Sequence, residues 1–323
     1  MTRHSKRWSL LLVIAIIIGT MYYYPLPYFI SKPGDALELA PIIQVEGGFE
    51  EEGDFMLTTI RISGANLFSY LLARWQTYME IIPKELLLAN HESEKEYTER
   101  QLRVMKSSQE NAIILAYKLA GKQVEVIEEG IMVEGVSADL PAQGVLKPGD
   151  IILSIDGHTV HNAEQLIKYV QAQQVGRQVT IGFEREGELL QEKLVLAELP
   201  LTKEEKEKGS LPKPGLGISV STKRSITATP PLHIDTERIG GPSAGLMFTL
   251  EIYNQLTEED ITKGYRIAGT GTIDTEGQVG RIGGIHQKVV AADKAKADIF
   301  FAPRDGGNYD RALEAAQDIG TKM

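Results

Sequence analysis

The chain has 323 residues, of which 42% are hydrophobic and 24% charged, and it contains no cysteine. This length allows about two domains of globular composition. The lack of cysteine excludes disulfides, thiolate metal sites and a cysteine nucleophile. The formal net charge of -10 makes the chain a poor electrostatic partner for nucleic acid, so we expect no nucleic-acid partner.

The N-terminus combines a basic head with an uncharged apolar run. Three basic residues precede the seventeen residues from Trp8 to Tyr24, which carry no charge. As a helix this run would span about 25 Å, slightly less than a bilayer core, and the aromatic residues at its end favour the membrane interface. We predict a cytoplasmic head and one transmembrane helix over 1–30, with everything after Ile30 outside the cell. The alternative is a cleaved signal peptide, but prolines and bulky aromatic residues stand where cleavage needs small ones.

Residues 31–121 contain one predicted strand and two or three predicted helices. "DFMLTTIRIS" alternates as a strand does, and "ANLFSYLLARWQTYMEII" has helical spacing. The charged "HESEKEYTERQLR" predicts a solvated helix or loop. "SSQENAIILAYKLAGK" is a clearer helix, with Ser107 and Glu110 as its capping box and Gly121 as its end.

From Gln123 onward, short strands and tight turns dominate. The pattern predicts strands on either side of Gly130, a turn at Pro148–Gly149, hairpins that turn at Asp156–Gly157 and Glu186–Gly187, and a helix capped by Asn162. Residues 199–214 form a charged linker with proline at both ends. Residues 215–323 return to strand-like alternation and carry the catalytic candidates.

This order of strands, with one helix before the final hairpin, resembles a PDZ domain over residues 122–198, and "GVLKPGDIILSIDG" is its most specific segment. That fold binds peptides by strand addition. We expect a peptide to pair with the strand after Gly130, its end held by backbone N–H groups, while the helix lines a side-chain groove. The candidate residues are Gly130, Ile131, Met132, Leu166 and Val170. The alternative is that these apolar residues only fill a small core.

The stretch "GGPSAG" at 240–245 introduces Ser243. Gly240 and Gly241 permit backbone angles closed to other residues, and Pro242 suits a first helical position. Ser243 would then lie at a helix N-terminus, where free N–H groups favour a developing oxyanion. A helix cap and a phosphate-binding turn are the other interpretations, and the second is weak because no GxxxxGK[ST] motif occurs.

A nucleophilic serine needs a base. The chain has six histidines but no HExxH motif, so we predict no metal, while a histidine triad stays open. "GGIHQKVVAADKAK" opens a helix after Gly284 and places Lys288 one turn in, among apolar neighbours. Burial and the helix N-terminus would both disfavour its charge, so the neutral amine could accept the Ser243 proton. A lone helical lysine is more often simply solvated.

"GGPSAG" and "GTGTIDTEGQVGRIGGIHQKVVAADKAKAD" at 269–298 resemble the two signature segments of the Lon-type serine protease domain. That family pairs the serine of the PSAG turn with the lysine after a Gly-Gly turn. The resemblance implies Ser243 as nucleophile and Lys288 as base, without a cofactor. It further implies Thr270 as a supporting hydroxyl and an oxyanion site in the turn of Gly241 and Pro242, formed by backbone N–H groups around Gly241–Ser243.

The whole chain resembles the membrane-anchored PDZ–Lon-like proteases of Gram-positive bacteria. This implies an α+β fold: a Lon-type protease domain that includes residues 31–121, an inserted PDZ-like barrel or sandwich, and one N-terminal transmembrane helix. It implies an ATP-independent serine endopeptidase at the outer face of the cell membrane, with a PDZ domain that binds substrate. Secreted peptides, such as pheromone precursors, or membrane-protein ectodomains would be its substrates. Family members assemble into rings, so a homo-oligomer is a further expectation.

The sequence departs from the family pattern in three places. ATP-driven relatives often have an acid where Gly240 stands, which leaves the resting conformation of the turn open. The chain has no ATPase module, so we expect it to cut flexible peptides or exposed loops. It stops at Met323, where another strand and helix are expected, which predicts a C-terminal truncation. The alternative function is a non-catalytic membrane-anchored PDZ scaffold on a degenerate protease body; the presence of both dyad residues argues against it.

Overall fold

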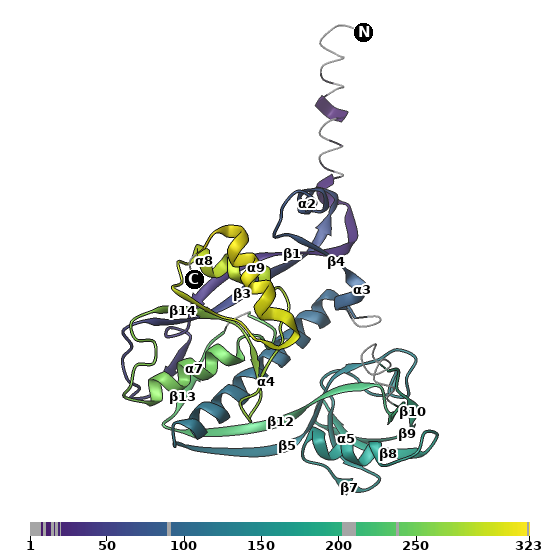
Figure 1. Ribbon diagram of the computed structural model, residues 1–323. Coiled ribbons are helices and arrows are strands. Elements are labelled where there is room, and N and C mark those ends of the chain that lie inside the picture. Colours follow the sequence, from purple (N-terminus) through teal and green to yellow (C-terminus); the bar gives the residue numbers. More distant parts are fainter. Residues whose placement is uncertain are drawn as a thin grey trace.

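The computed structural model describes residues 8, 11–13, 16, 19, 21–88, 92–201, 211–236, 239–321 and 323 (Figure 1). Much of the apolar run predicted to span a membrane lies outside these residues. Among the helices that are described, none has both the length and the apolar character needed to cross a bilayer. The last residues of the predicted 1–30 segment belong to a strand, because β1 begins at Pro25.

A five-stranded sheet forms the framework of the larger body. Its strands, in spatial order, are β17 (Ile299–Phe301), β14 (Arg266–Gly269), β3 (Asp54–Asn66), β1 (Pro25–Glu38) and β4 (Glu80–Pro83). The β14 and β17 strands run parallel to β3, whereas β1 is antiparallel to both β3 and β4. The predicted strand at "DFMLTTIRIS" is thus confirmed and is longer than expected.

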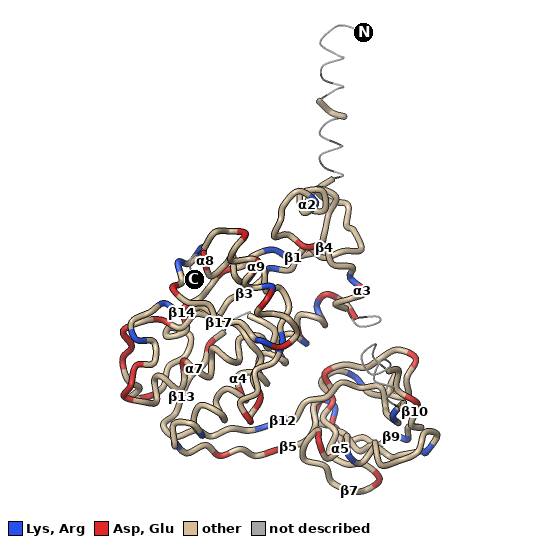
Figure 2. Tube along the Cα trace, viewed as in Figure 1, with Lys and Arg blue, Asp and Glu red and all other residues tan. Residues whose placement is uncertain are grey.

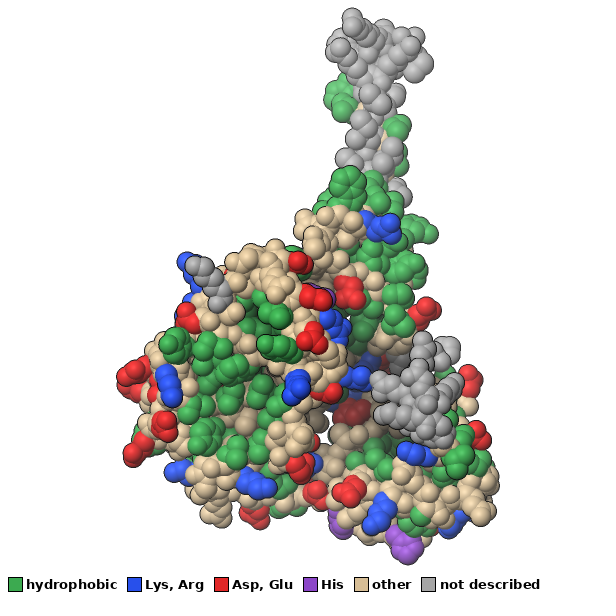
Figure 3. Space-filling model, viewed as in Figure 1, with side chains coloured by type: hydrophobic (Ala, Val, Ile, Leu, Met, Phe, Trp, Pro, Cys, Tyr) green, Lys and Arg blue, Asp and Glu red, His purple; other side chains and the backbone are tan. Residues whose placement is uncertain are grey.

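The predicted helix after this strand is short. Only α2 (Leu67–Ala73) forms there, followed by β4 and by α3 (Lys84–Leu87). In Figure 2 the chain around α2 is mostly uncharged, and Figure 3 shows apolar side chains over the same part of the surface. Charged side chains are spread over the rest of the molecule in these views.

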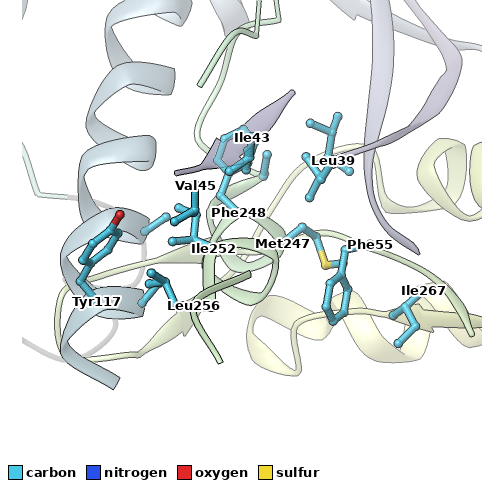
Figure 4. Packing of buried hydrophobic residues seen from close by; sticks show 14 of the residues in the cluster. Leu39, Ile43, Val45, Phe55, Tyr117, Met247, Phe248, Ile252, Leu256 and Ile267 are labelled. Atoms are coloured by element: carbon cyan, nitrogen blue, oxygen red, sulfur yellow. The ribbon is translucent and has the colours of Figure 1, made fainter. Parts of the chain in front are cut away.

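Helices cover both faces of the sheet. Because side chains alternate along a strand, Phe55 and Leu57 of β3 pack in one cluster with α7 (Gly245–Leu256), while Met56 between them packs with α8 (Ile285–Lys294). Figure 4 shows Met247, Phe248 and Ile252 of α7 in the first cluster. On its outer side α8 is covered by α9 (Asn308–Ile319).

One long helix, α4 (Glu94–Leu119), replaces the two predicted segments before Gly121. Its capping box is formed by Ser93 and Glu96, so Ser107 lies inside the helix and does not cap it. The continuous helix buries its apolar side against α7, and this packing outweighs the local capping signal at Ser107. Gly121 adopts a φ of +65° directly after the helix, which confirms it as the stop.

The smaller domain is built on a second sheet. Its strands, in spatial order, are β12 (Ile218–Thr229), β5 (Gln123–Val136), β6 (Ile151–Ile155), β8 (Gln178–Arg185) and β9 (Glu188–Val195). The short β7 (His158–Thr159) pairs with β6, and α5 (Ala163–Gln171) has Asn162 as its N-cap. Both predicted hairpins and this helix are confirmed. The two strands predicted around Gly130 are one strand with a register shift near that glycine.

The two sheets have separate hydrophobic cores. The first core takes residues from 39–57, 105–117 and 244–267, and the second takes residues from 131–216. The smaller domain is therefore inserted into the body. Its boundary differs from the prediction of 122–198, because Leu216 is buried in the second core and β12 pairs along β5. The pairing of the described strands gives an open sheet and does not show the predicted barrel or sandwich.

Three two-stranded pairings complete the described fold. They join β2 (Ile43–Val45) to β13 (Leu232–Ile234), β10 (Ala197–Glu198) to β11 (Pro214–Gly215), and β15 (Thr272–Ile273) to β16 (Val279–Gly280).

Substitutions at two buried phenylalanines can test whether the two cores are independent. Phe248 lies in the first core and Phe183 in the second. Replacing either one by alanine should cost about 3–5 kcal/mol in the domain that holds it. We expect Phe183→Ala to raise hydrogen exchange within 131–216 while 244–267 stays protected, and Phe248→Ala to do the reverse. Loss of protection in both regions from either substitution would contradict separate cores.

Candidate active site

Ser243 lies in the turn that leads into α7, but before the helix itself. The helix begins at Gly245 with Ala244 as its N-cap, so Pro242 is not the first helical residue, contrary to prediction. The Ser243 carbonyl accepts hydrogen bonds from the Gly271 N–H at 2.8 Å and from Thr270 Oγ1 at 2.9 Å. These bonds tie the backbone of the nucleophile to the end of β14.

Two glycines allow this turn to lie against α4. Gly241 adopts a φ of +91°, which favours glycine, and its N–H donates to the Gln101 carbonyl at 2.9 Å. A Cβ on Gly240 would lie 2.8 Å from Cβ of Gln101. The helix therefore leaves no room for a larger side chain at position 240. This contact gives a physical reason for glycine where the resembled family often has an acid.

Ser108, two turns further along α4, holds the other side of the turn. Its Oγ donates to the Pro242 carbonyl at 2.9 Å. A Cβ on Gly245 would lie 2.7 Å from the same Oγ, so glycine permits the close approach of α7 to α4. Sequence reasoning missed Gln101 and Ser108. Their spacing of seven predicts one shared helix face, but not which segment that face meets.

Lys288 points from the first turn of α8 to Ser243. Its Nζ donates to Ser243 Oγ at 2.7 Å and to Thr270 Oγ1 at 2.9 Å. The side chain is 2% exposed, and no carboxylate of the described residues forms an ion pair with it. Burial lowers the pKa of Lys288 to about 7. The structure thus brings together Ser243, Lys288 and Thr270.

Thr270 orients this pair. Its buried hydroxyl donates to the Ser243 carbonyl and accepts from Lys288 Nζ. Both roles of the hydroxyl are therefore used, and the amine is held by two oxygen atoms. No histidine among the described residues forms a hydrogen bond with Ser243. The described residues also contain no cluster of three potential metal ligands.

The oxyanion site predicted around Gly241–Ser243 is available only in part. The Gly241 N–H is already bonded to Gln101, and Pro242 has no N–H, so neither residue can donate to an oxyanion. The N–H groups of Ser243 and Ala244 have no acceptor among the described residues. These two donors are the available ones beside the Ser243 hydroxyl.

The cleft beside Ser243 has a volume of about 840 Å³. Its walls come from the turn, from α4 and from β3, and they include Leu57, Ile60, Ile62, Leu102, Met105 and Ile282. Beyond Leu57, β3 has no partner on its β14 side in the described part of the chain, because β14 pairs only with residues 54–57. An unpaired strand edge therefore borders the cleft. A second hollow of about 730 Å³, near Leu140 and Leu199, contains neither member of the Ser–Lys pair.

The predicted peptide site after Gly130 is wrong, because both edges of β5 are occupied there. Ile131 pairs with Thr222 of β12 on one side and with Ile152 of β6 on the other, and Met132 is paired in the same way. A peptide has no free edge to join at these residues. Leu166 and Val170 are buried in the second core, as the alternative interpretation proposed.

Of the two strands β5 and β12, the one with a free edge is β12. Within the described residues this strand pairs only with β5, and α5 lies beside it, since the Ala163 N–H donates to Thr222 Oγ1 at 3.1 Å. The strand begins at "GLGI", 215–218, where Gly217 has a φ of +79° and Leu216 is buried. This segment follows the linker in sequence, which is why the sequence pattern did not assign it to the smaller domain.

Comparisons with known families locate two domains in the chain. Residues 120–196 match the PDZ domain, and residues 233–315 match the Lon protease (S16) C-terminal proteolytic domain. The chain is 41% identical over 73 residues to a Lon protease of Campylobacter concisus, a match that covers 23% of this chain and 9% of that protein. It is 39% identical over 67 residues to the magnetosome formation protease MamE of Magnetospirillum gryphiswaldense, which covers 20% of this chain and 9% of that protein.

Some solved structures are similar to part of the chain. The PDZ domain of an SdrC-like protein from Listeria monocytogenes is 30% identical, with 28% of this chain and 87% of that chain covered and a TM-score of 0.25. The corresponding domain from Listeria innocua is 28% identical, with 28% and 93% covered and a TM-score of 0.25. The chain spans less than a tenth of the curated relatives it matches. Together the family matches support a protease of mixed α/β fold with a PDZ domain and a Lon-type proteolytic domain.

The buried amine of Lys288 predicts a pH-dependent stability. With a pKa of about 7 in the folded state and about 10.4 in the unfolded state, the unfolded chain binds more protons between these values. The free energy of unfolding therefore rises with pH in that range. We expect Lys288→Met to stabilise the protein by on the order of a few kcal/mol at pH 7 and below, with a smaller gain towards pH 10. Thermal unfolding measures this, with the exposed Lys294→Met as control; a gain that does not change with pH would contradict it.

Proposed function

We propose that the protein is an ATP-independent serine endopeptidase in which Ser243 and Lys288 form a catalytic dyad. The observation that carries this proposal is the 2.7 Å contact between Ser243 Oγ and a buried lysine amine whose pKa is about 7. A neutral amine takes the hydroxyl proton as Ser243 attacks the scissile carbonyl carbon. The same amine then returns the proton to the leaving nitrogen as the peptide bond breaks. Water hydrolyses the resulting acyl-enzyme by the reverse sequence of proton transfers.

The surrounding groups have separate roles in this mechanism. Thr270 holds the amine in line with Ser243, while its bond to the Ser243 carbonyl fixes the turn. The N–H groups of Ser243 and Ala244 would stabilise the oxyanion, because donors already aimed at developing charge need no reorganisation. Ala244 is thus the oxyanion donor in place of Gly241, which the sequence had predicted.

The cleft favours an extended peptide as substrate. A chain lying beside the unpaired edge of β3 would gain backbone hydrogen bonds beyond Leu57, next to the nucleophile. Folded domains do not offer such a free strand, and the chain contains no GxxxxGK[ST] motif for an ATP-driven motor. Flexible peptides and exposed loops with apolar side chains are the substrates that this cleft supports.

The PDZ domain would recruit these substrates through β12. Its free edge and the adjacent α5 provide the strand and helix that peptide addition requires. The uncharged run from Trp8 to Tyr24 and the basic residues before it support attachment to a membrane with the catalytic body outside. The substrates would then be secreted peptides or the ectodomains of membrane proteins.

Peptide hydrolysis by three variants tests the dyad. We expect Ser243→Ala and Lys288→Met each to lower kcat/KM for a flexible peptide by at least about a thousandfold, because both groups act in one step. The exposed Lys294→Met is the matched control and should retain full activity. Activity in Ser243→Ala equal to that of the unsubstituted chain would contradict the dyad. A chain that binds peptides but does not cleave them would instead be a scaffold.

The pH profile of the same reaction provides a second readout. Lys288 must be neutral to act as a base, so kcat/KM should fall about tenfold per pH unit below 7 and level off above it. A rate that stays constant down to pH 5 would mean that another group accepts the proton.

Hydrogen exchange during peptide binding tests the β12 site. A peptide with a free C-terminus should slow exchange in 216–222 and leave 130–132 unchanged, because β12 has an open edge beside α5 whereas β5 is paired on both sides. The same peptide with an amidated C-terminus is the control for recognition of the carboxylate. Protection that appears at 130–132 alone would contradict this assignment.

A further inference from the structure

The α2 helix presents an apolar face to solvent. Phe68, Leu71 and Leu72 occupy positions i, i+3 and i+4, and Trp75 follows at i+7 in the turn after the helix. Their exposed fractions are 52%, 45%, 38% and 88%. Spacing of this kind normally buries a helix face in a core. Here the four side chains, which we call the α2 face, point outward together.

The opposite side of α2 is already packed. Ala73 is buried with Ile30 and Ala65 in a small separate core, and a capping box between Asn66 and Ser69 fixes the start of the helix. The helix is thus held with its small residue inward and its large apolar residues outward. The α2 face is therefore not the exposed edge of an incomplete core, and a cluster of this kind on a surface indicates an interaction site.

The α2 face lies directly beside the end of the N-terminal apolar run. Asn66 Nδ2, at the start of α2, donates to the Tyr22 carbonyl at 2.9 Å. The side chains of Tyr22, Tyr23 and Tyr24 are exposed there. Figure 3 shows apolar side chains on both sides of the junction between this run and the body, with some polar and basic surface among them. The apolar surface therefore continues from the predicted membrane segment onto the folded body.

The composition of this surface matches the interfacial layer of a bilayer. Residues 63–79 contain no acidic residue and a single basic one, Arg74, in an otherwise acidic chain. Tryptophan and tyrosine are enriched where membrane and water meet, and an arginine beside them can extend its guanidinium to lipid phosphates. A protein partner would not require this aromatic band to continue from the apolar run.

We propose that the α2 face inserts into the interfacial layer of the lipid bilayer, next to the point where the N-terminal run enters it. This inference rests on the membrane attachment given under Proposed function and adds a second attachment point. Two adjacent contacts restrict the tilt of the body relative to the membrane. In Figure 1 the inserted domain lies at the far end from α2, so it would be held away from the lipid surface.

Tryptophan fluorescence tests the insertion directly, because the chain has only two tryptophans. In the full chain with Trp8→Phe, Trp75 is the single reporter. The protein is reconstituted in phosphatidylcholine vesicles with or without bromine on the acyl chains. We expect a blue-shifted emission and a roughly twofold loss of intensity in the brominated vesicles, as for a side chain at the headgroup–acyl boundary.

A second set of variants separates the face from the anchor. Adding Phe68→Ser and Leu72→Ser should reduce the quenching of Trp75, whereas Leu189→Ser, an exposed apolar residue of β9, should leave it unchanged. Trp75→Phe leaves Trp8 as the reporter of the N-terminal run. Quenching of Trp8 without quenching of Trp75 would overturn the α2 proposal and leave the anchor intact. Protein that does not float with vesicles would overturn both. A blue shift that depends on protein concentration but not on bromine would mean that a second copy covers the face.

Discussion

The buried amine of Lys288 is the interaction on which the rest of the site depends. A lysine that is 2% exposed loses most of its hydration, so the neutral form is favoured near pH 7. The amine is then held by two hydroxyl oxygens, those of Ser243 and Thr270. Gln101 and Ser108 bind the backbone of the turn that carries Ser243. The cost in stability of burying the amine is what makes it available as a base.

The α4 helix connects this site to the inserted domain. Gln101 and Ser108 hold the turn before α7. Other α4 residues hold the β5–β12 ribbon: Arg103 forms an ion pair with Glu134, which also accepts from Ser221, and Asn111 accepts from Arg224. The free-edged strand of the PDZ domain and the nucleophile turn are therefore attached to the same rigid element. The bonds from Gln101 and Ser108 to the turn join residues that are far apart in sequence. The fold as a whole, and not a local motif, therefore positions the serine.

Local signals predicted the local parts of the structure. The Asn162 cap, the two hairpins and the helix after Gly284 depend on residues close together in sequence, and all formed as expected. The Ser243 and Lys288 positions came from resemblance to a family, since neither residue alone distinguishes a catalytic group from a solvated one. The failures at the peptide site and at the Gly241 oxyanion donor were tertiary. The peptide site was placed on β5 because the sequence does not show that β12 returns across the linker to pair with it. The oxyanion donor was misplaced because the Gln101 carbonyl, far away in sequence, already takes the Gly241 N–H.

Titration of the Lys288 amine by NMR tests the central claim most directly. The chain is labelled with ¹³C at the lysine Cε positions, and the Lys288 signal is assigned by its absence from Lys288→Met. We predict a midpoint at about pH 7 for Lys288, well below the value of about 10.4 for lysine in an unfolded chain. A Lys288 midpoint above about pH 10, close to that of an ordinary lysine, would contradict the account.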